Sequence, residues 1–118
     1  MDELELGTME ARFADMIWEI APVSTTELIK RCAVAFDWKR TTTYTMLKRL
    51  CLRGIFLMEN STVTVLTTKE EFLEKRSRRF VHESFGGSLP AFVATFTRGR
   101  KLSKEDADAL QKLIDEAR

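Results

Sequence analysis

Histidine and cysteine are scarce in this chain. Among 118 residues there is one histidine, His82, and there are two cysteines, Cys32 and Cys51. One histidine cannot build a multi-histidine metal site, and it would be the only base available to a histidine-based triad. Both cysteines lie between apolar neighbours without a spacing motif, so we interpret them as buried thiols. The sequence also lacks a glycine-rich phosphate loop and any nucleophile–base pair, and we therefore expect neither a cofactor nor an enzyme.

Long hydrophobic runs are missing as well. The apolar stretches are only a few residues long, too short for a membrane-spanning helix. The acidic start MDELELGTMEARF lacks the basic and apolar segments of a signal peptide. With 44% hydrophobic and 31% charged residues, the chain has the composition of a soluble protein that can bury a core. We expect a cytoplasmic protein with no membrane partner, built as one domain or as one small domain with an appendage.

Acidic residues are absent from residues 39–54, which read KRTTTYTMLKRLCLRG and contain five cations. Residues 1–38, in contrast, contain three Lys and Arg against eight Asp and Glu. Because the net charge of the whole chain is only +1, this positive field is local. Such a field attracts a polyanion to one face of a protein.

Apolar spacing and capping patterns predict the first two helices. Phe13, Ile17 and Ile20 recur at helical spacing in a helix that Thr8 would cap and that ends at about residue 20. Ser24, followed by a glutamate three residues later, is the pattern of a capping box and opens a second helix. Between these helices Val23 is expected to form a minimal extended segment.

A third helix and a hairpin complete the N-terminal half. The third helix is expected from about residue 40 to 52, followed by Gly54 as its terminator. The next stretch, IFLMENSTVTVLT, is rich in β-branched residues and divided by a polar turn, which predicts a two-stranded hairpin. Three helices followed by a hairpin is the order of a winged helix-turn-helix. The predicted fold class is therefore mainly α with a small β-hairpin, and residues 1–67 form a winged-helix DNA-binding domain.

Residues 68–118 are predicted to be a helical dimerisation region. Thr68 and Glu71 form a second capping box that opens a helix to about residue 84, Gly86-Gly87 ends it, and Ser88 and Ser103 begin two more. A monomer of this length has little core in which to bury the apolar stripes of these helices, whereas two chains can share one core. An alternative is that the stripes fold back on the N-terminal domain. The expected dimer residues are Phe72, Phe80, Phe85, Leu89, Phe92, Val93, Phe96, Leu110, Leu113 and Ile114.

The cationic helix is predicted to read double-stranded DNA. Its cations have no acidic neighbours to pair with, and two of them stand at the helix start, where the helix dipole disfavours positive charge. Threonine hydroxyls and methyls suit base edges, and Lys and Arg suit phosphates. The expected DNA-binding residues are Lys39, Arg40, Thr41, Thr42, Tyr44, Thr45, Lys48, Arg49 and Arg53. The alternatives are an ordinary solvated face, or a winged-helix protein-interaction adaptor that does not read DNA directly.

Seven segments of the chain together form a recognisable pattern. They are Ile17-Trp18-Glu19, Pro22-Val23-Ser24, Glu27-Leu28-Ile29, Asp37-Trp38 with Thr42, Thr45, Leu47, Arg49, Leu50 and Gly54, Gly86-Gly87-Ser88-Leu89, Phe92-Val93-Ala94-Thr95-Phe96 and Leu102-Ser103-Lys104-Glu105-Asp106. In their order and spacing these segments resemble the BlaI/MecI/CopY family, the penicillinase-type repressors of bacteria. The likeness spans nearly the whole chain and implies a dimeric transcriptional repressor whose winged helix binds a palindromic operator. Its last three helices would then form the homodimer.

The chain departs from this family pattern at four places. Thr95 stands where antibiotic-responsive members have the asparagine of a cleaved Asn-Phe bond, which leaves open whether a regulatory protease acts on this chain. No cysteine follows Cys51, so the cysteine cluster of the copper-responsive members is absent. Asn60-Ser61 replaces the usual Gly-Arg of the wing tip, and Lys39-Arg40 replaces the usual Ser-Pro before the reading helix. These last two departures imply weaker contacts of the wing with DNA and extra positive charge at the start of the reading helix.

Overall fold

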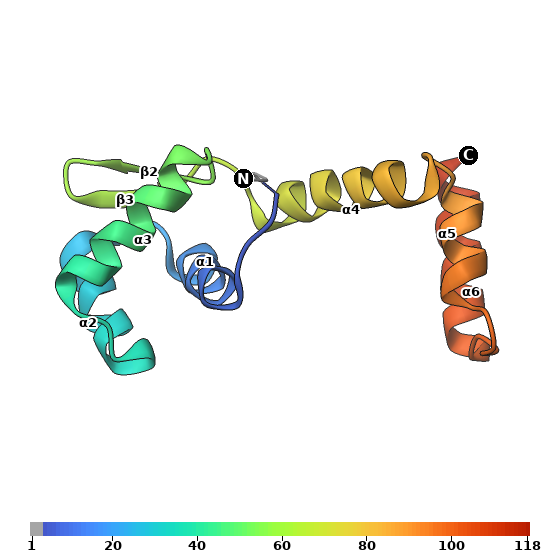
Figure 1. The fold of residues 1–118 in the computed structure, drawn as a ribbon, viewed down its shortest axis with the longest axis horizontal. Coiled ribbons are helices and arrows are strands. Elements are labelled where there is room, and N and C mark those ends of the chain that lie inside the picture. Colours follow the sequence, from blue (N-terminus) through green and yellow to red (C-terminus); the bar gives the residue numbers. More distant parts are fainter. Residues whose placement is uncertain (1–3) are drawn as a thin grey trace. The chain divides into compact units, whose positions relative to one another are not determined.

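The computed structural model describes residues 4–118, which form six helices and one three-stranded antiparallel sheet (Figure 1). The predicted fold class, mainly α with a small β-hairpin, is confirmed. None of the helices in residues 4–118 is long and apolar enough to cross a membrane. The elements are α1 (Thr8–Ile20), β1 (Val23–Ser24), α2 (Thr25–Phe36), α3 (Arg40–Leu52), β2 (Phe56–Glu59), β3 (Thr62–Val65), α4 (Lys69–Phe85), α5 (Leu89–Phe96) and α6 (Lys104–Ala117).

The chain divides into two compact units, and the division falls within α4, between Ser77 and Arg78. The sequence predicts a boundary between residues 67 and 68, immediately before that helix. The first unit contains α1 to α3, the sheet and the beginning of α4. The second contains the end of α4 together with α5 and α6.

The core of the first unit lies where α1, α2, α3 and the hairpin meet. Each element contributes side chains that are almost completely removed from water, and α4 adds one. Two tryptophans pack around this core: the Trp38 ring lies 5.2 Å from the Phe13 ring, and the Trp18 ring lies 5.6 Å from the Phe56 ring. The apolar core residues are Phe13, Ala14, Ile17, Val23, Leu28, Cys32, Leu47, Leu50, Ile55, Phe56, Val63 and Phe72.

The sheet has the strand order β1-β3-β2. β2 pairs with β3 along its whole length, from Phe56 opposite Val65 to Glu59 opposite Thr62. The turn residues Asn60 and Ser61 have φ angles of 51° and 59°, the positive values that a tight two-residue hairpin turn requires. The predicted hairpin is therefore present, and the extended segment expected at Val23 forms a short third strand beside β3.

Helix starts follow the capping patterns of the sequence. Ser24 Oγ accepts a hydrogen bond from the Glu27 N–H at 3.1 Å. At the start of α4 the box is reciprocal: Thr68 Oγ1 accepts from the Glu71 N–H and the Glu71 carboxylate accepts from the Thr68 N–H, both at 3.1 Å. These bonds lower the pKa of Glu71. Thr8 differs from its prediction as a cap, because it already belongs to α1 and the extended residue before it, Gly7, occupies the cap position.

Phe72 is placed in the core of the first unit. The sequence predicts it as a dimer contact, but its side chain is 3% exposed and its ring centroid lies 5.7 Å from that of Trp18. The next residue, Leu73, is 44% exposed. Because α4 turns Phe72 inward and Leu73 outward, Phe72 anchors α4 to the first unit and we leave it out of the proposed dimer surface.

We predict that Phe72→Ala lowers the free energy of unfolding by about 3–5 kcal/mol, because it empties a core site that Trp18 cannot fill. Urea denaturation at fixed protein concentration, followed by tryptophan fluorescence, measures the change. Leu73→Ala is the matched control on the same helix and is expected to lose less stability. Equal losses for the two variants would contradict the placement of Phe72 in the core.

Candidate nucleic-acid interface

The inner face of α3 fixes the orientation of the helix. Thr43 and Leu47 are each 1% exposed and Leu50 is completely buried, at the three- and four-residue spacing of one helical face. Thr43 satisfies its hydroxyl inside the helix by donating to the Lys39 carbonyl at 3.4 Å. Met46 and Cys51 flank this face and are partly buried against the core, and the exposed positions of α3 lie on the opposite side of the helix.

The outer face of α3 carries the polar residues that the sequence predicts. Thr41, Thr45 and Lys48 are exposed and Tyr44 is half-buried. The Thr45 hydroxyl donates to the Thr41 carbonyl at 2.9 Å, so its proton is used within the helix. The hydroxyl oxygen and the methyl group of Thr45 stay available to a ligand on the solvent side. Thr42 is also exposed, beside this row.

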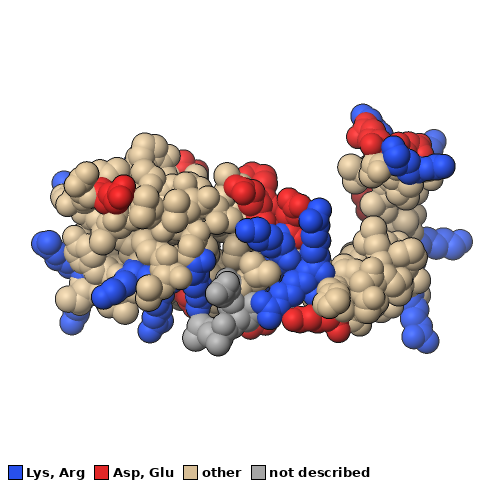
Figure 2. Space-filling model, turned by 90° about the horizontal axis from the view of Figure 1, so that it is seen from above, with Lys and Arg blue, Asp and Glu red and all other residues tan. Residues whose placement is uncertain are grey.

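Cations gather at the start of α3. Lys39 is the N-cap residue and Arg40 is the first helical residue, and both side chains are exposed. The guanidinium carbon of Arg40 lies 5.6 Å from the centroid of the Tyr44 ring, one helical turn further on. A hydrogen bond from the Thr25 side chain, followed by the contact with Arg40, lowers the pKa of the Tyr44 phenol. Figure 2 shows Lys and Arg side chains projecting along one edge of the unit at the left, which carries α3.

Two arginines at the end of α3 differ from each other. Arg49 is exposed, and its nearest polar contact is the Met46 sulfur at 3.8 Å. The Arg53 side chain is only 11% exposed: it forms an ion pair with Glu10 at 3.1 Å and donates to the Glu5 carbonyl at 2.9 Å. Arg53, which the sequence predicts as a DNA contact, therefore holds the segment before α1 and the start of α1 against the end of α3.

The tip of the hairpin is polar but carries no cation between Glu59 and Thr62. Asn60 and Ser61 are both exposed. Their left-handed backbone conformation is imposed by the tight turn. A wing of this kind offers amide, hydroxyl and backbone donors, and its side chains add no positive charge.

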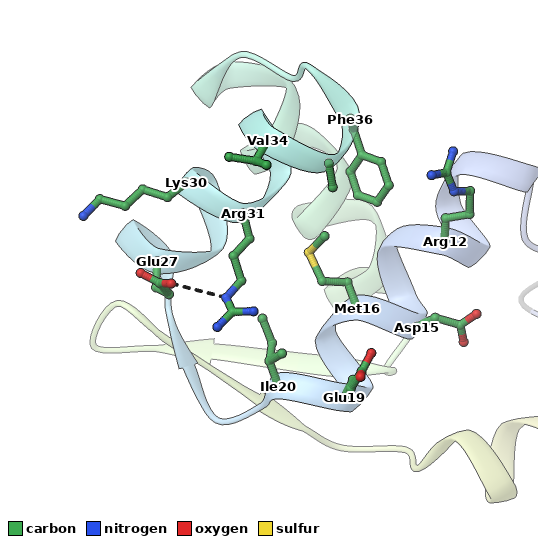
Figure 3. Close-up of a pocket in the computed structure, with 11 residues that line it drawn as sticks. Arg12, Asp15, Met16, Glu19, Ile20, Glu27, Lys30, Arg31, Val34 and Phe36 are labelled. Carbon is green, nitrogen blue, oxygen red and sulfur yellow. Dashed lines mark hydrogen bonds and ion pairs between the residues drawn. The ribbon is translucent and has the colours of Figure 1, made fainter.

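A hollow with a volume of about 690 Å³ lies between α1 and α2 in the first unit. Figure 3 shows Met16, Ile20 and Phe36 along its lining and Arg31 paired with Glu27, at 3.2 Å. The Arg12 guanidinium lies over the Phe36 ring. Its lining contains three basic and three acidic side chains, so it has no field of one sign. Within residues 4–118, no three His, Cys, Asp or Glu side chains gather closely enough to hold a metal ion.

The second unit contains the predicted dimer residues other than Phe72, and their side chains are largely accessible. α5 and α6 line an apolar groove of about 340 Å³ that includes Phe92, Phe96, Leu110 and Leu113. The rings of Phe80, Phe85 and Phe92 contact one another at 5.5–5.9 Å. Nevertheless, Phe80 remains 51% exposed. Other predicted dimer residues are also exposed: Leu89 60%, Val93 36%, Phe96 71%, Leu110 38%, Leu113 60% and Ile114 52%.

Comparison with known proteins points to one family. The chain matches the penicillinase repressor family over residues 6–116. It is 26% identical over 116 residues to the penicillinase repressor of Bacillus licheniformis, an alignment that covers 95% of this chain and 91% of that protein. It is 21% identical over 115 residues to the methicillin resistance regulatory protein MecI of Staphylococcus aureus, with 94% of each chain covered. The resemblance seen in the sequence is confirmed.

We predict that Arg53→Ala mainly destabilises the fold. Removing the guanidinium leaves Glu10, whose side chain is 16% exposed, without its charge partner, and a loss of about 1–3 kcal/mol is expected. Thermal unfolding measures the loss. Arg49→Ala is the matched control, because Arg49 is exposed near the same helix end, and its unfolding temperature should stay close to that of the parent. A stable Arg53→Ala protein would contradict the structural role.

Proposed function

This chain belongs to the penicillinase repressor family, and from that premise we propose that it represses transcription by binding double-stranded operator DNA as a homodimer through α3. The observation that carries the proposal is the two-sided character of α3. One side is locked into the core by Thr43, Leu47 and Leu50. The opposite side presents hydroxyls flanked by cations and contains no carboxylate.

α3 has the properties of a recognition helix. A helix of this kind lies in the major groove, with residues near its N-terminus on base edges and flanking cations on phosphates. Thr41, Thr42, Tyr44 and Thr45 occupy the part of α3 that would face the bases. The phosphate contacts fall to Lys39, Lys48 and Arg49. Arg53 is excluded from the interface because Glu10 and the Glu5 carbonyl already bind it.

The homodimer is assigned to the second unit. Phe96, Leu113 and Ile114 are each more than half exposed in the single chain, an arrangement that costs free energy in water and is relieved when a second copy covers them. A two-fold dimer presents the same helix twice. Such dimers bind two half-sites about 34–36 Å apart, which explains why the operator of a symmetric dimer is palindromic.

Thr95 bears on how the protein would be released from its operator. Thr95 is exposed on α5, and the residue after it, Phe96, is 71% exposed. The side chain of Thr95 is shorter than the family's asparagine and lacks its amide. A protease that recognises the Asn-Phe bond would therefore find neither the amide nor the same shape at this position.

We predict nanomolar binding to a specific duplex, with an affinity that falls steeply as salt rises. Lys48→Ala should weaken binding to all sequences about equally and reduce the salt slope by about one. Thr45→Val, which keeps the shape and removes the hydroxyl, should change the preferred sequence instead. Fluorescence anisotropy against selected and scrambled duplexes separates the two effects.

The matched control for this titration is Lys112→Ala. The Lys112 side chain is 77% exposed on α6, distant in sequence from the proposed interface, and its ion pair with Glu116 is long at 3.9 Å. Its removal should leave affinity and salt slope unchanged. Binding that is absent, or insensitive to salt, would contradict the proposal and favour a winged-helix adaptor for proteins.

We further predict that Leu113→Asp gives a monomer, because it puts a charge into an apolar surface that the dimer would bury. Sedimentation at micromolar concentration measures the state. DNA affinity should fall with it, since one α3 is then bound at a time. Lys112→Asp on the same helix is the control and should remain dimeric. A monomeric parent protein would contradict the proposed assembly.

A further inference from the structure

Arg40 and Tyr44 form a contact pair at the start of α3. They are separated by one helical turn, and a side chain in a helix leans toward the N-terminus, over the preceding turn. The Tyr44 ring therefore lies toward Arg40, and the guanidinium carbon sits 5.6 Å from the ring centroid. Lys39, the neighbouring cation, is the residue before the helix and makes no such contact in residues 4–118.

Tyr44 also lies near a second helix. The side chain of Thr25, the first residue of α2, lowers the pKa of the Tyr44 phenol, and Thr25 is only 5% exposed. Tyr44 itself is half-buried, and the Arg40 guanidinium lies over its ring. A half-buried ring has less freedom to move than an exposed one, so it offers Arg40 a support.

The chemistry of this pair suits a base rather than a phosphate. A guanidinium is planar and carries five N–H donors, so contact with a ring leaves an edge that can donate two parallel hydrogen bonds. Guanine presents two acceptors, O6 and N7, at that spacing in the major groove. A phosphate attracts any nearby cation, and this attraction depends little on how the side chain is oriented. A bidentate contact with a base, in contrast, forms only when the guanidinium has the correct orientation.

We propose that Arg40 is a specificity-determining residue that selects guanine in the DNA bound by α3, and that Tyr44 is the residue that positions it. The inference rests on the proposed function and deepens it. Lys39 has no forked guanidinium and no aromatic ring beside it, so it would contribute positive charge without a preference for sequence. Within this interface, only the pair at residues 40 and 44 combines a forked donor with an aromatic support.

The test compares base preference at constant charge. Double-stranded fragments are first selected from a random pool with the parent protein, and every base pair of the selected site is then replaced in turn. Replacing the guanine read by Arg40 should cost the parent about 5- to 150-fold in affinity. Arg40→Lys should lose that discrimination at this one base pair and keep the parent's salt slope, because the charge is retained.

Tyr44 variants test the positioning role. Tyr44→Leu, which removes the ring, should reduce the same discrimination between base pairs although Arg40 is still present. In the double variant with Arg40→Lys, Tyr44→Leu should cause little further loss of that discrimination. Tyr44→Phe keeps the ring and removes only the hydroxyl, which interacts with Thr25 and Arg40. Because the ring is what supports the guanidinium, this variant should keep most of the preference. This conservative variant remains informative if Tyr44→Leu folds poorly, which circular dichroism would reveal.

The outcomes separate the inference from the function on which it rests. If the parent protein binds no duplex in a salt-dependent manner, the proposed function fails. If the parent binds but Arg40→Lys keeps its base preference, the inference alone is overturned. It is also overturned if Arg40→Lys weakens all sequences equally, which is the behaviour expected of the control Lys39→Ala.

Discussion

The burial of one face of α3 is the constraint on which the rest of the first unit depends. Leu47 and Leu50 each contribute about 1.5–3 kcal/mol by leaving water, and Thr43 fills the third position without an unpaired hydroxyl. A rotation of the helix would expose all three. Because the inner face admits one orientation, the outer face is also fixed: its hydroxyls and cations are exposed and Tyr44 is half-buried as a consequence of the core.

Local signals in the sequence were sufficient for most of the fold, and distant contacts account for the differences. The capping boxes at Ser24 and Thr68 and the bounds of α3 are decided by residues within one or two turns, so pattern reasoning finds them. Arg53 and Phe72 are different. Their partners, Glu10 and Trp18, lie in a helix far away in the chain, and no spacing rule connects them. The effect of Thr25 on the pKa of Tyr44 also joins residues of two different helices, and no local pattern predicts it.

The two units differ in how they treat apolar side chains. The first unit encloses a core in which Phe13, Phe56 and Leu28 are fully buried. Over residues 78–118, by contrast, α5 and α6 contain no buried residue, although the Phe92 and Phe96 rings of α5 lie 6.0 Å apart. Two short helices cannot surround a core of their own. The apolar pattern that predicts a helix is the same in both units, and only the structure distinguishes a face that is covered from one that is exposed in the single chain.

The charges of α3 oppose the stability of the helix that carries them. Lys39 and Arg40 stand at the positive end of the helix dipole, and the first turn contains no acidic residue. The contact between Arg40 and the Tyr44 ring offsets part of this unfavourable interaction with the dipole, by about 0.5–1 kcal/mol for an exposed pair. A bound anion would turn the remaining unfavourable free energy into a favourable one, because the helix dipole and both cations would then attract the same anion. A sequence selected for stability alone would place an acid there, so the placement of two cations is consistent with the DNA binding that we propose for this helix.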